Sequence, residues 1–243
     1  MRWRMLEKVA AAAGLLVSMA LPAAARAQQA VDLALVLAVD ASASITDGGW
    51  TFQLRGHSAA FRNPRVADAI ASGPHGRIAV TVARFAGPNS LSTLVPWTIV
   101  GSAAEAEAFA AAIDAAPTAG RGGATAVGSA MDAAAKLLAT APGEAPRRTI
   151  DLSSNGFSNA GIAPEEAKPR LEAAGITLNA LVILDEYDWL EEYYQENVIA
   201  GPGAFVRTAE DRDSFYEAIL GKLVLEISAR PDPQSGIRAF AAR

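Results

Sequence analysis

The sequence predicts an α/β fold of the doubly wound class, in which a mainly parallel sheet carries helices on both faces. Apolar runs alternate with helical patterns along most of the chain. Several of these runs are near-continuous, which is typical of strands that are buried on both faces. No repeat, long linker or shift in composition interrupts residues 28–230, so we expect one domain over this range.

The elements follow from the pattern in chain order. The first apolar run, residues 32–39, ends at Asp40 and predicts a buried strand. A helix is predicted to start at Thr46 and Asp47, because such residues favour helix N-termini. Its apolar face extends from Trp50 to Val66. Further strands are predicted over 77–85, 91–100, 148–153, 176–184 and 204–207. Further helices are predicted over 102–115, 125–141, 164–174, 187–198 and 211–227.

The first 27 residues have the features of a secretory signal peptide. Basic side chains precede an apolar stretch from Val9 to Leu21, and residues 25–27 (Ala-Arg-Ala) fit a cleavage site. The stretch is shorter than the ~20 residues that span a bilayer, which disfavours a membrane anchor. We therefore expect residues 1–27 to be removed, no transmembrane segment to remain, and the protein to be periplasmic or secreted. Residues 231–243 are predicted to form a flexible C-terminal tail.

Charge and cysteine content exclude several classes of function. The chain has a formal net charge of −5 and no cysteine. Loss of residues 1–27 would remove four basic side chains and one acidic one, which changes the net charge to −8. Nucleic acid is not expected as a partner, because phosphate binding needs a basic face. Without cysteine there is no disulfide, thiol nucleophile or lipid-modified cysteine.

Polar side chains directly follow the first predicted strand. Asp40, Ser42 and Ser44 alternate in a loop at its carboxyl end. In doubly wound sheets, ligands bind beyond the carboxyl ends of strands, where the strand order reverses. One carboxylate and two hydroxyls form an all-oxygen set that suits a hard divalent cation, Mg²⁺ or else Mn²⁺ or Ca²⁺. The alternative is a helix N-cap, because Ser and Asp also favour that position.

The pattern Asp-x-Ser-x-Ser after a buried strand resembles the metal-ion-dependent adhesion site of von Willebrand factor A domains. The resemblance implies two further ligands, a threonine from a later loop and a carboxylate at the end of the fourth strand. Thr125, after the glycine-rich residues 120–123, stands at the first position. Residues 154–156 read Ser-Asn-Gly where the family usually has Thr-Asp-Gly, which puts Asn155 at the second. The order of predicted elements fits over nearly all of residues 31–227.

The resemblance also implies a fold and a mode of binding. The expected fold is that of a von Willebrand factor A domain over residues 28–230. The implied mode is recognition of a protein partner, whose acidic side chain completes the coordination of the ion. In addition, residues 190–206 resemble a segment of an exported bacterial family that carries only a domain-of-unknown-function label.

Asn155 departs from the pattern of the family. Its carbonyl oxygen can face a cation but has no charge, so Asp40 is the one clear carboxylate of the set. We expect weaker metal retention and a stronger pull on a partner carboxylate. Asp151 is about 13 Å away along an extended strand, at ~3.3 Å per residue, which is too far to replace it. Asp185 and Glu186 end the next predicted strand and either contribute to an outer shell of the site or lie in a solvated loop.

Three functions remain open at this point. We favour a non-enzymatic binding module, and a degenerate site without metal would instead leave an interaction scaffold. A metal-assisted hydrolase would need a general base near the ion, and the motif loops show no obvious one. His57 and His75 have no serine on a Gly-x-Ser-x-Gly turn with which to form a triad.

An aromatic cluster stands close to the last of these loops in the sequence. It consists of Tyr187, Trp189, Tyr193 and Tyr194 and is interleaved with acidic residues. One interpretation is helix packing with a solvated acidic face. The other is a partner surface beside the metal loops, because Tyr and Trp are enriched in binding hot spots.

Overall fold

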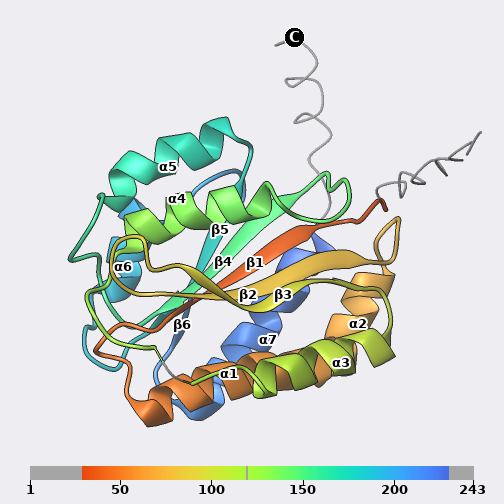
Figure 1. Ribbon diagram of the computed structural model, residues 1–243, viewed down its shortest axis with the longest axis horizontal. Coiled ribbons are helices and arrows are strands. Elements are labelled where there is room, and N and C mark those ends of the chain that lie inside the picture. Colours follow the sequence, from red (N-terminus) through yellow and green to blue (C-terminus); the bar gives the residue numbers. More distant parts are fainter. Residues whose placement is uncertain (1–28, 119, 230–243) are drawn as a thin grey trace, which may run out of the picture.

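The computed structural model describes residues 29–118 and 120–229 and shows a sheet with helices on both sides (Figure 1). The strands are β1 (Ala34–Asp40), β2 (Ile78–Phe85), β3 (Ser92–Val100), β4 (Arg148–Ser154), β5 (Thr177–Ile183) and β6 (Val206–Ala209). The helices are α1 (Asp47–Arg62), α2 (Pro64–Ala71), α3 (Ala103–Asp114), α4 (Val127–Leu138), α5 (Pro164–Ala173), α6 (Leu190–Asn197) and α7 (Arg212–Ser228). The predicted signal peptide and C-terminal tail lie outside the described residues and stay predictions.

The strand order is β3-β2-β1-β4-β5-β6. The pairs β1–β2, β1–β4, β4–β5 and β5–β6 are parallel, and β3 runs antiparallel to β2 at the edge. The chain builds outward from β1 to one edge and then continues from β4 to the other, so the order reverses between β1 and β4. Val39 pairs with Ser153, which places the carboxyl ends of these two strands side by side. The predicted doubly wound α/β class is confirmed.

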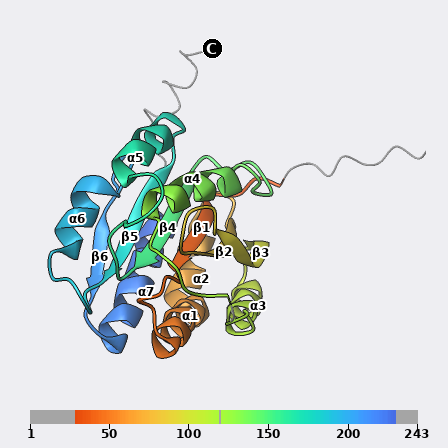
Figure 2. The same ribbon diagram turned by 60° about the vertical axis from the view of Figure 1, so that its left-hand side comes forward.

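The sheet separates two layers of helices. In Figures 1 and 2, α4 and α5 lie over one face and α1, α3 and α7 lie over the other. Successive side chains of β1 point to opposite faces. Leu35 and Leu37 therefore pack with residues of α1, α3 and α7, whereas Val36 and Ala38 pack with residues of α4, α5 and α6. The central strand is buried on both faces, as its near-continuous apolar sequence predicts.

The predicted first helix is divided into two by Asn63 and Pro64. The side chain of Asn63 accepts a hydrogen bond from the backbone N–H of Arg65 at 3.0 Å and so caps α2. Proline has no N–H to donate, which makes it favourable at the first position of a new helix. Other boundaries shift by two or three residues: α4 ends at Leu138, α6 begins at Leu190, and β6 covers residues 206–209 rather than 204–207.

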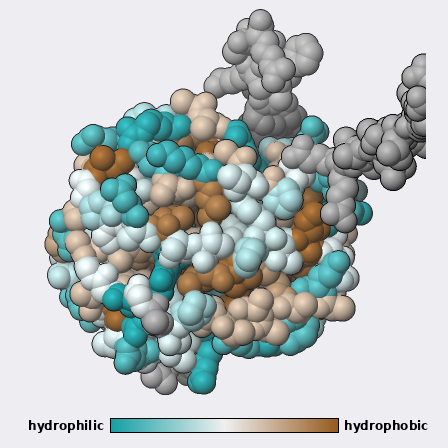
Figure 3. Space-filling view, in the orientation of Figure 1, coloured by the Kyte–Doolittle hydropathy of each residue, from teal (hydrophilic) through white to brown (hydrophobic). Residues whose placement is uncertain are grey.

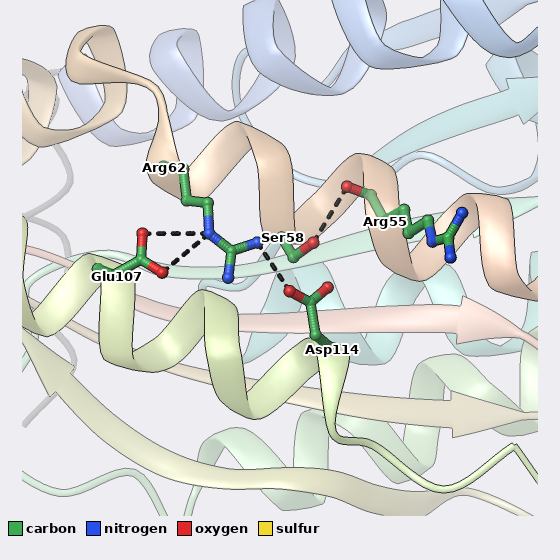
Figure 4. Close-up of polar contacts among 5 residues, drawn as sticks. All are labelled: Arg55, Ser58, Arg62, Glu107 and Asp114. Atoms are coloured by element: carbon green, nitrogen blue, oxygen red, sulfur yellow. Dashed lines mark hydrogen bonds and ion pairs between the residues drawn. The ribbon is translucent and has the colours of Figure 1, made fainter.

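Close contacts fix α1 against its neighbours. Arg62 donates hydrogen bonds to Glu107 and Asp114 of α3, at 3.0 Å and 2.7 Å (Figure 4). These side chains are largely exposed, so water screens the pairs and they orient the helices more than they stabilise the fold. On the other side, a Cβ atom at Gly56 would lie 2.4 Å from the ring of Phe215 in α7. Glycine at position 56 therefore permits the close approach of α1 and α7.

A buried set of charges joins α7 to the sheet. The ammonium group of Lys222 lies 2.6 Å from a carboxylate oxygen of Asp151 in β4 and 2.6 Å from one of Glu226. The side-chain amide of Asn179 in β5 donates to the same Glu226 oxygen at 2.7 Å. Burial, with a further contribution from Asp151, raises the pKa of Glu226 to about 8. The core thus disfavours the charged form of Glu226, although Lys222 and Asn179 partly offset that effect.

The surface is mixed in character. On the face drawn in Figure 3, apolar side chains occur in small separate groups among hydrophilic ones. None of the helices in the described ranges is long and apolar enough to cross a membrane.

Candidate metal site

The candidate metal site lies at the carboxyl ends of β1 and β4, where the strand order reverses. The loop after β1 contacts the glycine-rich loop before α4 through its backbone. The N–H of Ala43 donates to the carbonyl of Gly123 at 2.9 Å, and the N–H of Gly122 donates to the carbonyl of Ala41 at 2.8 Å. Gly122 and Gly123 have φ values of 112° and 95°, a region that other residues rarely occupy. Glycine here lets one loop follow the other closely.

Three of the five candidate residues form a chain of side-chain oxygens. The hydroxyl oxygens of Ser42 and Ser44 are 3.2 Å apart. The hydroxyl of Ser44 donates to Oδ1 of Asn155 at 2.8 Å, across 111 residues of sequence. Ser42 and Asn155 are buried and Ser44 is half-buried, so the chain reaches solvent at Ser44.

Asp40 lies beneath this chain and is fully buried. Its Oδ1 accepts the backbone N–H of Ser42 at 2.8 Å, and its Oδ2 accepts the hydroxyl of Ser154 at 2.5 Å. Burial raises the pKa of Asp40 above its usual value, and the two hydrogen bonds partly offset that rise. A carboxylate in such a place is stabilised further by a nearby cation, because opposite charge favours its ionised form.

Thr125 comes from the glycine-rich loop and lies against the β4 loop. Its backbone N–H donates to the side-chain carbonyl of Asn159 at 2.8 Å, and its own carbonyl accepts the N–H of Asn159 at 2.8 Å. Its hydroxyl oxygen would be 3.3 Å from a Cβ atom placed on Gly156, the residue after Asn155. The structure thus brings all five predicted residues to neighbouring loops, with Thr125 buried beside the end of β4.

The orientation of the Asn155 amide follows from its two partners. Its Nδ2 donates to Oδ2 of Asp185 at 3.3 Å, and its Oδ1 accepts from Ser44. An ionised carboxylate can only accept hydrogen bonds, so the amide nitrogen must face Asp185 and the amide oxygen must face the serines. Asp185 is exposed but contacts the site, whereas no described contact links Glu186 to it.

The donor set fits a small divalent cation. For Mg²⁺ with bonds of about 2.1 Å in an octahedron, neighbouring ligand oxygens are about 3 Å apart. The spacings of 3.2 Å between Ser42 and Ser44 and 2.8 Å between Ser44 and Asn155 match such an edge. Within the described ranges, no group of three or more His, Cys, Asp or Glu side chains could hold a metal. Binding would therefore depend on hydroxyl and amide oxygens with Asp40.

Two residues that hold the site in place were not identified from the motif alone. Ser154 bonds Asp40 through its hydroxyl and accepts the N–H of Gly156 at 3.1 Å. Tyr194 of α6 is buried and donates its hydroxyl to the carbonyl of Gly156 at 2.8 Å. The position of Ser154 beside Asn155 in the motif was a usable signal for the first. No local signal marks the second, because the contact joins residues that are 38 apart in the sequence.

The aromatic cluster has one member more than the predicted one. Tyr194 is buried, and its ring centroid lies 5.6 Å from that of Tyr193. Phe157, three residues after Ser154, joins the other rings. The ring of Phe157 has its centroid 5.5 Å from Tyr187, 5.5 Å from Trp189 and 6.5 Å from Tyr193. Ser158 links the β4 loop to this cluster, because its N–H donates to the Tyr193 hydroxyl at 3.3 Å.

Comparison with solved structures identifies the class of fold. The proximal thread matrix protein 1 of the mussel byssus, in a form with a zinc-occupied MIDAS motif, is 20% identical with a TM-score of 0.57. The match covers 82% of this chain and 47% of that one. A von Willebrand factor type A structure from Catenulispora acidiphila is 16% identical with a TM-score of 0.53, covering 81% and 43%. The pilus adhesin SpaC from Lactobacillus rhamnosus GG is 14% identical with a TM-score of 0.54, covering 83% and 30%.

These matches show that the chain has the von Willebrand factor A fold. The chain spans about half the length of the mussel protein. Within this class, the chain belongs to the family described as "Protein of unknown function (DUF1194)", whose model matches residues 30–231. The expected membership of a domain-of-unknown-function family is thereby confirmed. No curated protein sequence matches the chain.

Proposed function

We propose that this protein is an exported binding module that recognises a protein partner through a divalent cation. Asp40, Ser42, Ser44, Thr125 and Asn155 would hold the cation, with the hydroxyls as direct ligands and Asp40 and Asn155 as direct or water-mediated ones. The observation that carries the proposal is the chain of oxygens at 2.8–3.2 Å that ends at solvent beside a buried carboxylate.

Recognition would use the positive charge of the cation that the ligands do not neutralise. When bound, the cation supplies a positive centre that attracts an anionic group. Asp40 is the one carboxylate among the five residues, so a divalent ion there keeps about one positive charge. A carboxylate of the partner would neutralise that charge and complete the coordination. Ser44 is the half-buried member of the set, so the partner would approach from its side.

Two of the compared proteins support binding as the general role. One is named as a pilus adhesin and the other as a thread matrix protein, and the latter holds zinc at its MIDAS motif. With the predicted signal peptide, these names favour a periplasmic or secreted location. Magnesium is the proposed ion because the ligands are hard oxygens without thiolate or imidazole.

Binding is favoured over catalysis by the positions of the bases. His57 is buried in α1 with its Nδ1 2.8 Å from the carbonyl of Gln53. The loop of His75 contacts Asp32, which precedes β1 and therefore lies at the opposite ends of the strands. A metal-assisted hydrolase would need a general base at the site itself. Neither histidine lies there, and the carboxylate of Asp185 meets the site only through the amide of Asn155. We therefore propose a non-enzymatic role.

Calorimetric titration of the purified protein with Mg²⁺ and Mn²⁺ tests this function. We expect one site per chain that is lost in Asp40→Ala and in the double variant Ser42→Ala with Ser44→Ala. Removal of the buried Asp40 carboxylate could itself disturb the fold. The serine variant keeps Asp40, so loss of binding in that variant reports on the site. Asp188→Asn removes an exposed charge outside the site and should bind like the wild type. Unchanged binding in both site variants would refute the proposed site.

A second candidate is a metal-free interaction scaffold. The oxygens of the site already satisfy one another, since Ser44 donates to Asn155 and Ser154 donates to Asp40. Such a closed network does not require a cation. Absence of Mg²⁺ and Mn²⁺ binding at millimolar concentration would favour this function over the first.

A further inference from the structure

The loops beside the candidate site present a partly exposed aromatic surface bordered by carboxylates. We call it the aromatic–acidic face, and it consists of Phe157, Tyr187, Trp189 and Tyr193 with Asp185, Glu186, Asp188 and Glu192. Trp189 is 45% exposed and, with Leu225, is one of two exposed large apolar side chains among the described residues. Its ring contacts Tyr187 at 5.2 Å and Tyr193 at 6.2 Å between centroids.

Packing of α6 does not account for this exposure. Leu190, Tyr194 and Val198 are fully buried, and they attach the helix to the β4–β5 side of the core. Trp189 precedes α6 at its N-cap position, where its side chain makes no capping hydrogen bond. Because 45% of Trp189 is still exposed, a partner that covers the ring removes apolar surface from water and gains binding energy.

The charge of the face defines the chemistry of that partner. Asp185, Glu186, Asp188 and Glu192 are exposed, and none forms an ion pair with a Lys or Arg in the described parts of the chain. Glu165 of α5 also acts on Tyr193, whose pKa is raised chiefly by burial and further by that carboxylate. Unpaired carboxylates beside Trp and Tyr rings attract Arg and Lys, both by charge and by cation–π contact.

We propose that the aromatic–acidic face docks a polypeptide segment that carries Arg or Lys next to an apolar side chain. The proposal deepens and partly rests on the proposed function, because Asp185 belongs to both surfaces through its hydrogen bond from Asn155. A partner would place a carboxylate at the metal and basic side chains on the face beside it. The face itself needs no metal, so the two parts are separable by experiment.

Selection from a random 12-residue peptide library displayed on phage tests the proposal. The purified full-length protein is the target, in buffer with EDTA so that the metal site does not contribute. We expect enriched peptides to combine Arg or Lys with an aromatic or aliphatic residue. Fluorescence anisotropy of one synthetic peptide should then show affinity that falls at least tenfold between 50 mM and 500 mM NaCl, because screening weakens exposed charge pairs.

Matched variants locate the binding surface. Trp189→Ala should weaken the peptide at least tenfold, whereas Leu225→Ala, the other exposed large apolar side chain, should leave the affinity within twofold. Glu192→Lys should weaken it strongly, and Glu217→Lys on exposed α7 surface should weaken it much less. Replacing EDTA by Mg²⁺ should leave the affinity of the wild type within twofold, because the face itself needs no metal.

Three results would overturn the proposal. The first is no enrichment, or enrichment of acidic peptides. The second is equal affinity in Trp189→Ala and Leu225→Ala. The third is peptide binding that appears only with Mg²⁺ and is lost only in Asp40→Ala, which would assign recognition to the metal site alone.

Discussion

The side-chain amide of Asn155 connects Ser44 to Asp185. Oδ1 accepts the Ser44 hydroxyl at 2.8 Å, and Nδ2 donates to the Asp185 carboxylate at 3.3 Å. The amide thus presents its oxygen to the candidate metal site and its nitrogen to a carboxylate outside it. The family pattern has an aspartate at position 155, which puts a carboxylate at the site itself. In this chain the carboxylate of Asp185 contacts the site only through the amide of Asn155.

Asn155→Asp should tighten metal binding. The change adds a charge beside the proposed ion with little change in volume. Coulomb attraction at ~4–5 Å with an effective dielectric near 20 is of order a few kcal/mol before desolvation and proton competition. We expect at least a tenfold lower Kd for Mn²⁺ by calorimetry and a stronger loss of binding as pH falls. The gain should vanish with Asp40→Ala, since both residues act at one site. Equal affinities of wild type and Asn155→Asp would show that the β4 loop does not reach the ion.

Asp185→Asn should weaken metal binding in the wild-type background. The carboxylate fixes the amide of Asn155, and an asparagine at 185 would allow the amide to turn its nitrogen toward the ion. We expect a severalfold higher Kd with an unchanged melting temperature in EDTA, because Asp185 is exposed. The combination Asn155→Asp with Asp185→Asn keeps the net charge and should bind at least as tightly as the wild type. A wild-type Kd in Asp185→Asn alone would remove this role.

Ser154→Ala should destabilise the fold more than Ser153→Ala. The hydroxyl of Ser154 donates to buried Asp40, whereas that of buried Ser153 has no hydrogen-bond partner among the described residues. Loss of a hydrogen bond to a buried carboxylate costs about 1–3 kcal/mol. Urea denaturation of the two neighbouring serine variants measures the difference directly. Similar losses of unfolding free energy in both would contradict the assigned contact.

Glu226 should make the protein less stable as the pH rises. Its pKa is about 8 in the fold, against an ordinary value of 4.5. Between these values the folded chain holds a proton that the unfolded chain has lost, so the stabilisation present below about pH 4.5 declines until about pH 8. Glu226→Gln should flatten this part of the stability curve. Glu217→Gln on the exposed side of the same helix is the control, and an identical slope in both variants would refute the assignment.

Local patterns were sufficient for most of the fold. The near-continuous apolar run before Asp40 predicts the buried central strand, and the residues that cap α1, α3 and α7 are visible as Thr46, Ser102 and Asp211. The division at Pro64 was missed because helical periodicity continues across it. The buried pair of Asp151 and Lys222 could not be predicted, since α7 reads as an ordinary closing helix and the contact joins distant segments.

The sequence predicts which loops form the site, but not the contacts between those loops. Asp40, Ser42 and Ser44 follow one strand in an alternating pattern, which is a local signal. Their relation to Asn155 depended on a family resemblance, because the Ser44–Asn155 contact spans 111 residues. The supporting hydroxyl of Ser154 and the outer carboxylate of Asp185 emerge only when β1, β4 and β5 lie side by side.

Anomalous diffraction from crystals of the protein soaked in Mn²⁺ tests the central claim most directly. The account predicts a manganese peak within coordination distance of the hydroxyl oxygens of Ser42 and Ser44, beside Asp40 and Asn155. The peak should be absent in crystals of the variant that combines Ser42→Ala and Ser44→Ala. A manganese peak elsewhere on the chain, or no peak at millimolar Mn²⁺, would contradict the metal-bridged mode of recognition.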